Sequence, residues 1–235
     1  MLLVAAALAG AAAGFLVYRH HAPAAAGLEP LTGLPAAPPS PPALATAATS
    51  AAPAAAPVPA TPVIPAIVPD ISLPDLAGKA HALRSTDGHP RLFNFWATWC
   101  EPCRREIPLL NTLQDVYAGD GLQIVGVAVD FRDAVQAYVK TTRLHYTSLV
   151  GEEDGLAAAQ RFGMDLLLPF SVFADERNRI VAVKVGELHR DEADAILAQM
   201  RQLRAGRTDL PEAQSAIAAK MTQLAQQRAK QSAPK

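Results

Sequence analysis

The sequence predicts an α/β domain over residues 68–204, built around parallel strands, and two patterns carry this expectation. Residues 92–96 and 122–129 are nearly continuous apolar runs of strand length, as in strands that are covered on both faces. Between them, apolar residues step along one helical face, at Cys103, Ile107, Leu110, Leu113 and Tyr117. The order of strand, helix and strand is that of a β-α-β unit, which makes the two strands parallel.

The other expected elements surround this unit on both sides. Before it, residues 71–73 and 80–83 flank the turn Asp75-Leu76-Ala77-Gly78 and predict a hairpin. After Asp130, two helical patterns predict an insertion, and two strands about a polar turn and a last helix then complete the domain. These later elements are expected, in order, at residues 132–143, 152–162, 170–174, 180–185 and 190–204.

The first part of the chain predicts no packed domain. Residues 1–18 are free of charged side chains and long enough for a membrane anchor or the core of a signal segment, which we expect over residues 1–21. Of the 20 prolines, 13 lie in residues 22–69, together with many alanines. This composition favours an extended, disordered linker over residues 22–67.

The end of the chain, residues 205–235, predicts a helical extension. Asp209 and Glu212 have the spacing of a capping pair. Ile217, Met221 and Leu224 form a thin apolar stripe on the helix that follows. We therefore expect a largely solvated helix that docks in part on the domain.

Charge and cysteine content exclude several classes of protein. The chain carries 21 basic and 22 acidic side chains, a net charge of −1. This balance excludes nucleic acid as a partner bound electrostatically by the protein as a whole. Its 2 cysteines, Cys100 and Cys103, are too few for a framework of structural disulfides or a four-cysteine zinc site. These two sulfurs are expected to act together.

The strongest motif is the segment 96–103, Trp-Ala-Thr-Trp-Cys-Glu-Pro-Cys, at the junction of a predicted strand and helix. The start of a helix offers unpaired backbone N–H groups and the positive end of the dipole, so we predict a lowered pKa for the Cys100 thiol. Pro102 suits the first helical turn because its missing N–H costs nothing there. The alternatives are half of a metal site or two inert thiols.

With these residues in view, the sequence resembles the membrane-tethered thioredoxin-like proteins of the TlpA/ResA group. The resemblance lies in residues 68–76, in Phe93 to Cys103 with its Trp-Cys-x-Pro-Cys core, and in residues 163–186. It implies a thioredoxin-like fold with an N-terminal hairpin extension and a central helical insertion.

The resemblance also assigns roles to site residues. It implies that Cys100 attacks a target disulfide, that Cys103 resolves the mixed disulfide, and that Pro169 is a cis-proline beside the dithiol. The backbone of Leu168 would then pair with an extended substrate. The substrate-binding surface implied in this way consists of Trp99, Glu101, Pro102, Leu168 and Phe170.

One position departs from thioredoxin itself, whose buried aspartate on the strand before the dithiol corresponds to Asn94 here. Another group must then handle the proton of Cys103. Asp130, at the end of the next strand, is our candidate, and a helix-capping role for Asp130 is the alternative.

These observations predict a thiol–disulfide oxidoreductase without a cofactor or metal, held at the inner membrane and facing the periplasm, or secreted there if the N-terminal segment is cleaved. Its expected partners are periplasmic protein thiols and disulfides, such as those of apocytochromes or copper sites, and a membrane electron donor that recycles it. The alternative is a copper-binding or copper-delivering module that combines the thiol pair with a histidine such as His145.

Overall fold

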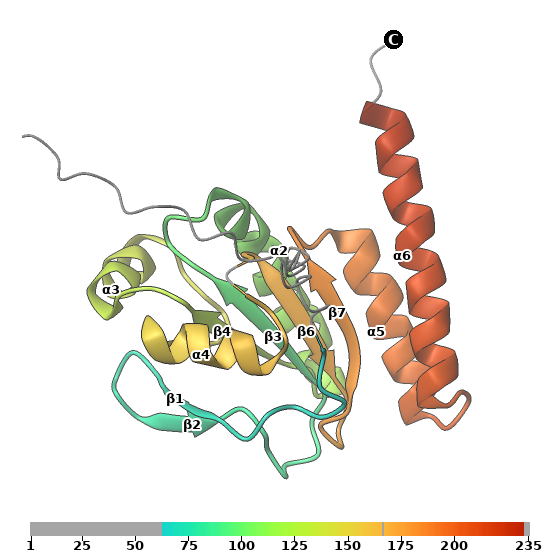
Figure 1. Ribbon diagram of the computed structural model, residues 1–235, viewed down its shortest axis with the longest axis horizontal. Helices are drawn as coiled ribbons and strands as arrows, with labels where there is room; N and C mark the ends of the chain where they lie inside the picture. Colours follow the sequence, from blue (N-terminus) through green and yellow to red (C-terminus); the bar gives the residue numbers. More distant parts are fainter. Residues whose placement is uncertain (1–62, 166, 233–235) are drawn as a thin grey trace, which may run out of the picture. The chain divides into compact units, whose positions relative to one another are not determined.

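A mixed sheet lies at the centre of the computed structural model, which describes residues 63–165 and 167–232 (Figure 1). Its strands are β3 (Arg91–Trp96), β4 (Gln123–Ala128), β5 (Thr147–Val150), β6 (Phe170–Ala174) and β7 (Ile180–Val185). They are ordered β5-β4-β3-β6-β7 across the sheet. The pairs β3–β4 and β4–β5 are parallel, whereas β3–β6 and β6–β7 are antiparallel. This is the predicted thioredoxin-like arrangement.

Helices cover both faces of the sheet because the side chains of β3 alternate between two apolar clusters. Leu92 packs with α2 (Glu101–Tyr117) and α5 (Arg190–Arg204), while Phe93 and Phe95 pack with α4 (Glu153–Arg161) and the hairpin on the other face. Figure 1 shows α4 and the hairpin in front of the sheet and α2 behind it. The helix α3 (Arg132–Thr141) packs near the dithiol end of α2, and the short helix η1 (Ala118–Asp120) follows α2.

The predicted N-terminal hairpin is confirmed. Its strands β1 (Ser72–Pro74) and β2 (Ala80–Ala82) pair antiparallel, with Leu73 opposite His81. The Asp75 carboxylate closes the turn by accepting hydrogen bonds from the backbone N–H groups of Ala77 and Lys79, both at 2.9 Å. A further bridge joins Asp75 to Leu149, so the hairpin is tied to β5.

The edge strand β5 was not predicted. Only four residues long, it carries Thr147 and Ser148 before Leu149 and Val150, so its composition shows neither a continuous apolar run nor an alternation. Its extended state comes instead from the parallel ladder that it forms with β4. Strand formation here is a tertiary effect, which local patterns do not record.

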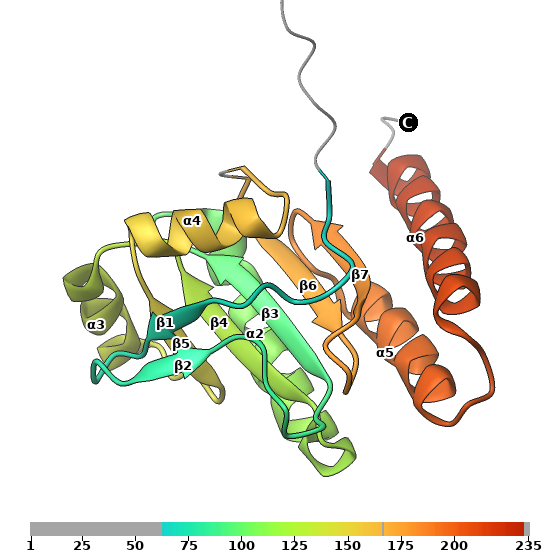
Figure 2. The ribbon, with the colours of Figure 1, turned by 60° about the horizontal axis from the view of Figure 1, so that its bottom comes forward.

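The predicted C-terminal helix is present as α6 (Leu210–Ser232), which lies beside α5 in both views (Figures 1 and 2). The capping pair is formed, since the backbone N–H of Glu212 donates to Asp209 Oδ1 at 2.9 Å. Ile217 and Leu224 of the predicted stripe are buried, with Met221 partly buried against the same cluster as α5. The remaining face of α6 is solvated.

The predicted anchor or signal segment, residues 1–21, and most of the predicted linker, residues 22–67, lie outside the described residues. The last linker residues are described, and they already contact the domain: Ile67 bridges to Arg179, and the Ala66 carbonyl accepts a hydrogen bond from Ile180. Among residues 63–165 and 167–232, no helix combines the length and the apolar character that crossing a membrane requires.

Candidate active site

Cys100 and Cys103 lie where the chain leaves β3 and enters α2, and they are joined by a disulfide. Cys100 is the N-cap residue of α2, and its Sγ accepts a hydrogen bond from the backbone N–H of Cys103 at 3.3 Å. Pro102 stands in the first turn, as predicted. Cys100 is 5% exposed and Cys103 is fully buried, so of the two cysteines only Cys100 keeps any contact with solvent.

Three large apolar residues, Trp99, Phe131 and Leu167, are 60–62% exposed on segments close to the dithiol in the chain or in the fold, and we call them the apolar rim. Trp99 precedes Cys100, and Leu167 precedes Leu168, which packs against the cluster that contains both cysteines. Trp99 and Phe131 line one hollow of about 210 Å³, whose other walls are Val129, Asp130, Glu152 and Leu156. The rim therefore offers exposed apolar contact area, whereas Cys100 and Cys103 are almost completely covered.

The two neighbours of Pro169, Leu168 and Phe170, differ in whether their side chains lie near the dithiol. The Leu168–Pro169 peptide bond is cis, as predicted, and Leu168 packs against the cluster that contains both cysteines. The Phe170 side chain is fully buried on the opposite face, stacked on Phe95 with ring centroids 4.3 Å apart. Of the substrate-binding residues expected here, Leu168 lies at the dithiol and the side chain of Phe170 does not.

Glu101, also expected in the substrate-binding surface, is exposed at the first position of α2. Its carboxylate accepts a hydrogen bond from Arg105 Nη1 at 3.3 Å. Arg105 also binds Glu187, with a 2.6 Å contact from Nη2 to Oε2. These contacts link the start of α2 to the loop that follows β7.

Asp130 lies beside the segment that precedes the dithiol. Its Oδ2 accepts hydrogen bonds from the backbone N–H of Thr98 at 2.8 Å and from Thr98 Oγ1 at 2.6 Å. Its Oδ1 accepts from the N–H of Phe131, and Phe131, not Asp130, is the N-cap residue of α3. The carboxylate thus fastens Thr98, two residues before Cys100, and its role as acceptor of the Cys103 proton stays a prediction.

Glu106 is the residue that sequence reasoning missed. It follows Cys103 by one helical turn and is 1% exposed. Its Oε1 accepts from Asn94 Nδ2 and its Oε2 from the backbone N–H of Leu188, both at 2.7 Å. Burial raises the pKa of Glu106 from 4.5 to about 7, and these two hydrogen bonds act against that rise. A carboxylate on the apolar face of a predicted helix was the available signal.

His145, the histidine considered as a third copper ligand, pairs with Asp115 at 2.8 Å. It lines a surface hollow with Gln114 and Arg143, not the hollow beside Trp99. Within the described part of the chain, no three His, Cys, Asp or Glu side chains are grouped as a metal site would need.

Comparisons with known proteins identify the family of this chain. Residues 65–198 match the Redoxin family. The thiol-disulfide oxidoreductase ResA of Geobacillus kaustophilus is 28% identical over 134 residues, which are 57% of this chain and 75% of that protein. The thioredoxin-like protein YneN of Bacillus subtilis is 35% identical over 132 residues, 54% of this chain and 74% of that protein.

Solved structures give the same result. A crystal structure of a thiol:disulfide interchange protein of the thioredoxin family from Chlorobium tepidum is 28% identical, with a TM-score of 0.51. The similarity covers 59% of this chain and 97% of that one.

Proposed function

The chain belongs to the Redoxin family and is a thiol:disulfide oxidoreductase, and on this premise we propose that Cys100 is its nucleophile and Cys103 its resolving cysteine. One observation carries the assignment. Cys100 caps the N-terminus of α2 beside an exposed Trp99, whereas Cys103 is fully buried one turn into the helix. The unpaired N–H groups and the dipole at this end stabilise a thiolate on Cys100 rather than on Cys103.

In the reducing direction, the Cys100 thiolate attacks one sulfur of a target disulfide, whose S–S bond breaks as a mixed disulfide forms. The released target thiolate takes a proton from solvent. The thiolate of Cys103 then attacks Cys100 Sγ and expels the second target thiolate. The second target thiolate also takes a proton from solvent, so the target has gained two electrons and two protons, and the protein ends as the Cys100–Cys103 disulfide.

The second step needs an acceptor for the Cys103 proton, and we assign this role to the Glu106 carboxylate. It lies one turn after Cys103 on the same buried face of α2. Burial holds its pKa at about 7, so the group can take up and release a proton near neutral pH. Asp130 is then a positioning residue, whose bonds to Thr98 fix the segment before Cys100.

Targets are proposed to bind as extended segments along Leu168 and Pro169, with apolar side chains against the rim of Trp99, Phe131 and Leu167. The 60–62% exposure of these three side chains supports this surface. The target class suggested by the resemblance is a cysteine pair of an apocytochrome or of a copper site. An unidentified dithiol donor at the membrane would return Cys100 and Cys103 to the reduced state.

The proposed location is the periplasmic side of the inner membrane. The uncharged apolar residues 1–18 support export, and the proline-rich residues 22–67 support a spacer that holds the domain away from the bilayer. An oxidising compartment is also where a protein that reduces chosen disulfides has substrates.

Trapping of mixed disulfides tests the assignment. Cys103→Ser should accumulate covalent complexes with target proteins, which a reductant releases, because the second step is blocked. Cys100→Ser should accumulate few or none. Non-reducing gels of both variants, with mass spectrometry of the trapped partner, decide the outcome. Equal trapping by both variants contradicts the proposal, and stoichiometric copper on the parent without any trapping supports the copper alternative.

A further inference from the structure

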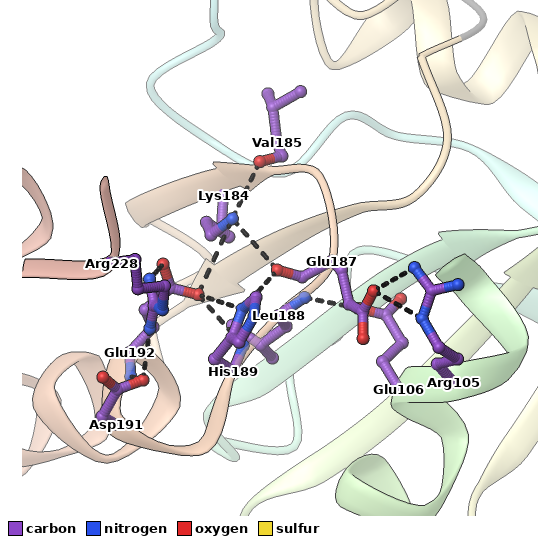
Figure 3. Close-up of polar contacts among 10 residues, drawn as sticks. All are labelled: Arg105, Glu106, Lys184, Val185, Glu187, Leu188, His189, Asp191, Glu192 and Arg228. Carbon is purple, nitrogen blue, oxygen red and sulfur yellow. Dashed lines mark hydrogen bonds and ion pairs between the residues drawn. The ribbon is translucent and has the colours of Figure 1, made fainter. Parts of the chain in front are cut away.

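The helix α6 lies entirely outside the segment that matches the Redoxin family, residues 65–198, yet a series of polar contacts connects it to the dithiol helix α2. Figure 3 shows the connection, from Arg228 of α6 on one side to Arg105 and Glu106 of α2 on the other. The contacts run from Arg228 through Glu192 and the loop after β7 to Glu106.

The connection begins with Arg228, near the end of α6. Its Nη1 donates to Glu192 Oε1 at 2.7 Å, and its Nη2 contacts Asp191, both in the first turn of α5. The Glu192 side chain is only 5% exposed, so its charge depends on nearby cations for compensation. Arg228, on the C-terminal helix α6, is one of these cations.

Glu192 in turn holds the loop between β7 and α5. Its Oε2 accepts from the backbone N–H of His189 at 3.0 Å and lies 3.3 Å from His189 Nδ1. The same oxygen lies 3.6 Å from Lys184 Nζ, which donates to the carbonyls of Val185 and Glu187. Arg228, Lys184 and His189 therefore all contact the buried carboxylate of Glu192. Because Lys184 and His189 also belong to or bind residues 185–189, their contacts with Glu192 affect the conformation of this segment.

The loop then reaches the active site at two places. Leu188 donates its backbone N–H to Glu106, and the Glu187 carboxylate binds Arg105 on α2. The N–H of Gly186 donates to the carbonyl of Pro169 at 2.8 Å. One short loop thus contacts the dithiol helix and the proline segment, and Glu192 anchors its far end.

We propose that Arg228 is a positioning residue of the redox site: through Glu192 it fixes the loop 185–189, and the loop presents the Leu188 N–H to Glu106. When Arg228 is lost, Lys184 is drawn toward the uncompensated Glu192 and away from the loop carbonyls. The Leu188 N–H then holds the Glu106 carboxylate less firmly. The inference rests on the proposed role of Glu106 as proton acceptor.

The direction of the effect follows from the groups that face Glu106. The Leu188 N–H, the Asn94 amide and the charge of Lys184 lower its pKa, and the charge of Glu187 raises it. Burial raises the pKa of the Tyr146 hydroxyl, just before β5, and the charge of Glu106 raises it further. Loosening the loop weakens two of the contacts that lower the pKa of Glu106, so that pKa rises.

The test is the pH profile of disulfide exchange by the full chain, with a direct NMR titration of the Glu106 carboxyl. Arg228→Ala should move the acidic limb of the profile and the Glu106 titration to higher pH by up to about 1 unit, equivalent to losing one hydrogen bond to a charged group. Lys220→Ala is the matched control, since it removes a cation of α6 whose recorded contact is Gln223 on the same helix. It should leave both measurements unchanged.

Two further variants separate the possible failures. Arg228→Lys retains a charge and should fold even where Arg228→Ala does not, with a smaller shift in the same direction. In a Glu106→Gln background, the Arg228 substitution should leave the profile unaltered. If Glu106→Gln itself leaves the acidic limb in place, the proposed role of Glu106 is wrong. If Glu106→Gln removes the limb but neither Arg228 variant moves it or the Glu106 titration, the role of Arg228 is wrong.

Discussion

The side-chain amide of Asn94 on β3 donates a 2.7 Å hydrogen bond to the carboxylate of Glu106 on α2. The strand position that carries an acid in thioredoxin therefore holds a neutral donor here, and the buried acid stands on the dithiol helix instead. A second donor, the Leu188 N–H, binds its other oxygen. The acid near Cys103 is thus fixed by two neutral groups, and its titration depends mainly on burial.

Replacement of Glu106 by glutamine should change how stability depends on pH. Burial raises the pKa of Glu106 from 4.5 to about 7, so between these values the folded chain binds a proton that the unfolded chain releases. This contribution to stability is complete at low pH and is lost as the pH rises through about 7. Relative to Glu106→Gln, the free energy of unfolding of the parent should fall by about 3 kcal/mol between acidic and mildly alkaline pH.

Denaturant unfolding of both proteins across this pH range measures the difference. Glu101→Gln, which changes an exposed carboxylate on the same helix, is the control for the loss of a charge. A constant difference between the parent and Glu106→Gln at every pH would contradict the raised pKa of Glu106.

Asp130→Asn should slow disulfide exchange to a similar extent at every pH and destabilise the fold. Asn can offer one carbonyl oxygen where the carboxylate now accepts three hydrogen bonds from Thr98 and Phe131. A buried donor left without a partner costs about 1–3 kcal/mol. Thermal unfolding and the pH profile of exchange are the measurements.

Thr98→Val supplies the comparison for Asp130, because it removes only the hydroxyl donor. It should reproduce part of the loss in stability. A loss of rate in Asp130→Asn that is confined to pH below neutrality would instead support Asp130 as the acceptor of the Cys103 proton, against the assignment to Glu106.

Trp99→Ala should weaken reaction with protein disulfides while leaving reaction with oxidised glutathione nearly unchanged. Trp99 is 62% exposed in the apolar rim, and in the proposed binding mode it contacts the target segment and takes no part in the sulfur chemistry. Burial of a large aromatic side chain in an interface contributes on the order of 2 kcal/mol, so kcat/KM for a protein target should fall more than tenfold.

Val116→Ala is the matched control for the rim, because Val116 is also exposed, at 56%, near the far end of α2. It should leave both reactions unchanged. Equal losses with protein and small disulfides in Trp99→Ala would show that Trp99 acts on the dithiol itself and would remove the rim from target binding.

The N-terminal segment should place the domain outside the cytoplasmic membrane. Protease added to intact spheroplasts should degrade the domain, because the proposed linker of residues 22–67 leaves it accessible. A chain lacking residues 1–21 is the control and should be recovered protected, inside the cell. Protection of the full chain under these conditions would contradict the proposed location.

The sequence predicts those parts of the fold whose local pattern agrees with their environment. Strands β3, β4, β6 and β7 are largely apolar. The helix α5 has the predicted bounds, Arg190–Arg204, because its apolar stripe and its flanking segments are both distinct. The sequence of β5 carries no strand pattern, because Thr147 and Ser148 are extended only through their parallel pairing with β4.

The same distinction applies to the site. The dithiol is predictable because both cysteines and the start of the helix lie within four consecutive residues, 100–103. Glu106 was missed because its partners, Asn94 and Leu188, are separated from it by 12 and 82 positions. Its burial results from the way that the loop after β7 closes over α2, a contact that no local window contains.

The difference in accessibility between Cys100 and Cys103 has a consequence for how the protein meets its partners. Among the described residues, Cys103 is fully covered and Cys100 keeps a small exposed fraction of 5%. If Cys100 is the attacking cysteine, as proposed, electron donor and target must both reach it, and we expect them to occupy the same face in turn. We therefore expect double-displacement kinetics, in which a high concentration of one partner inhibits the reaction with the other. A surface that binds the target must then also accept the donor.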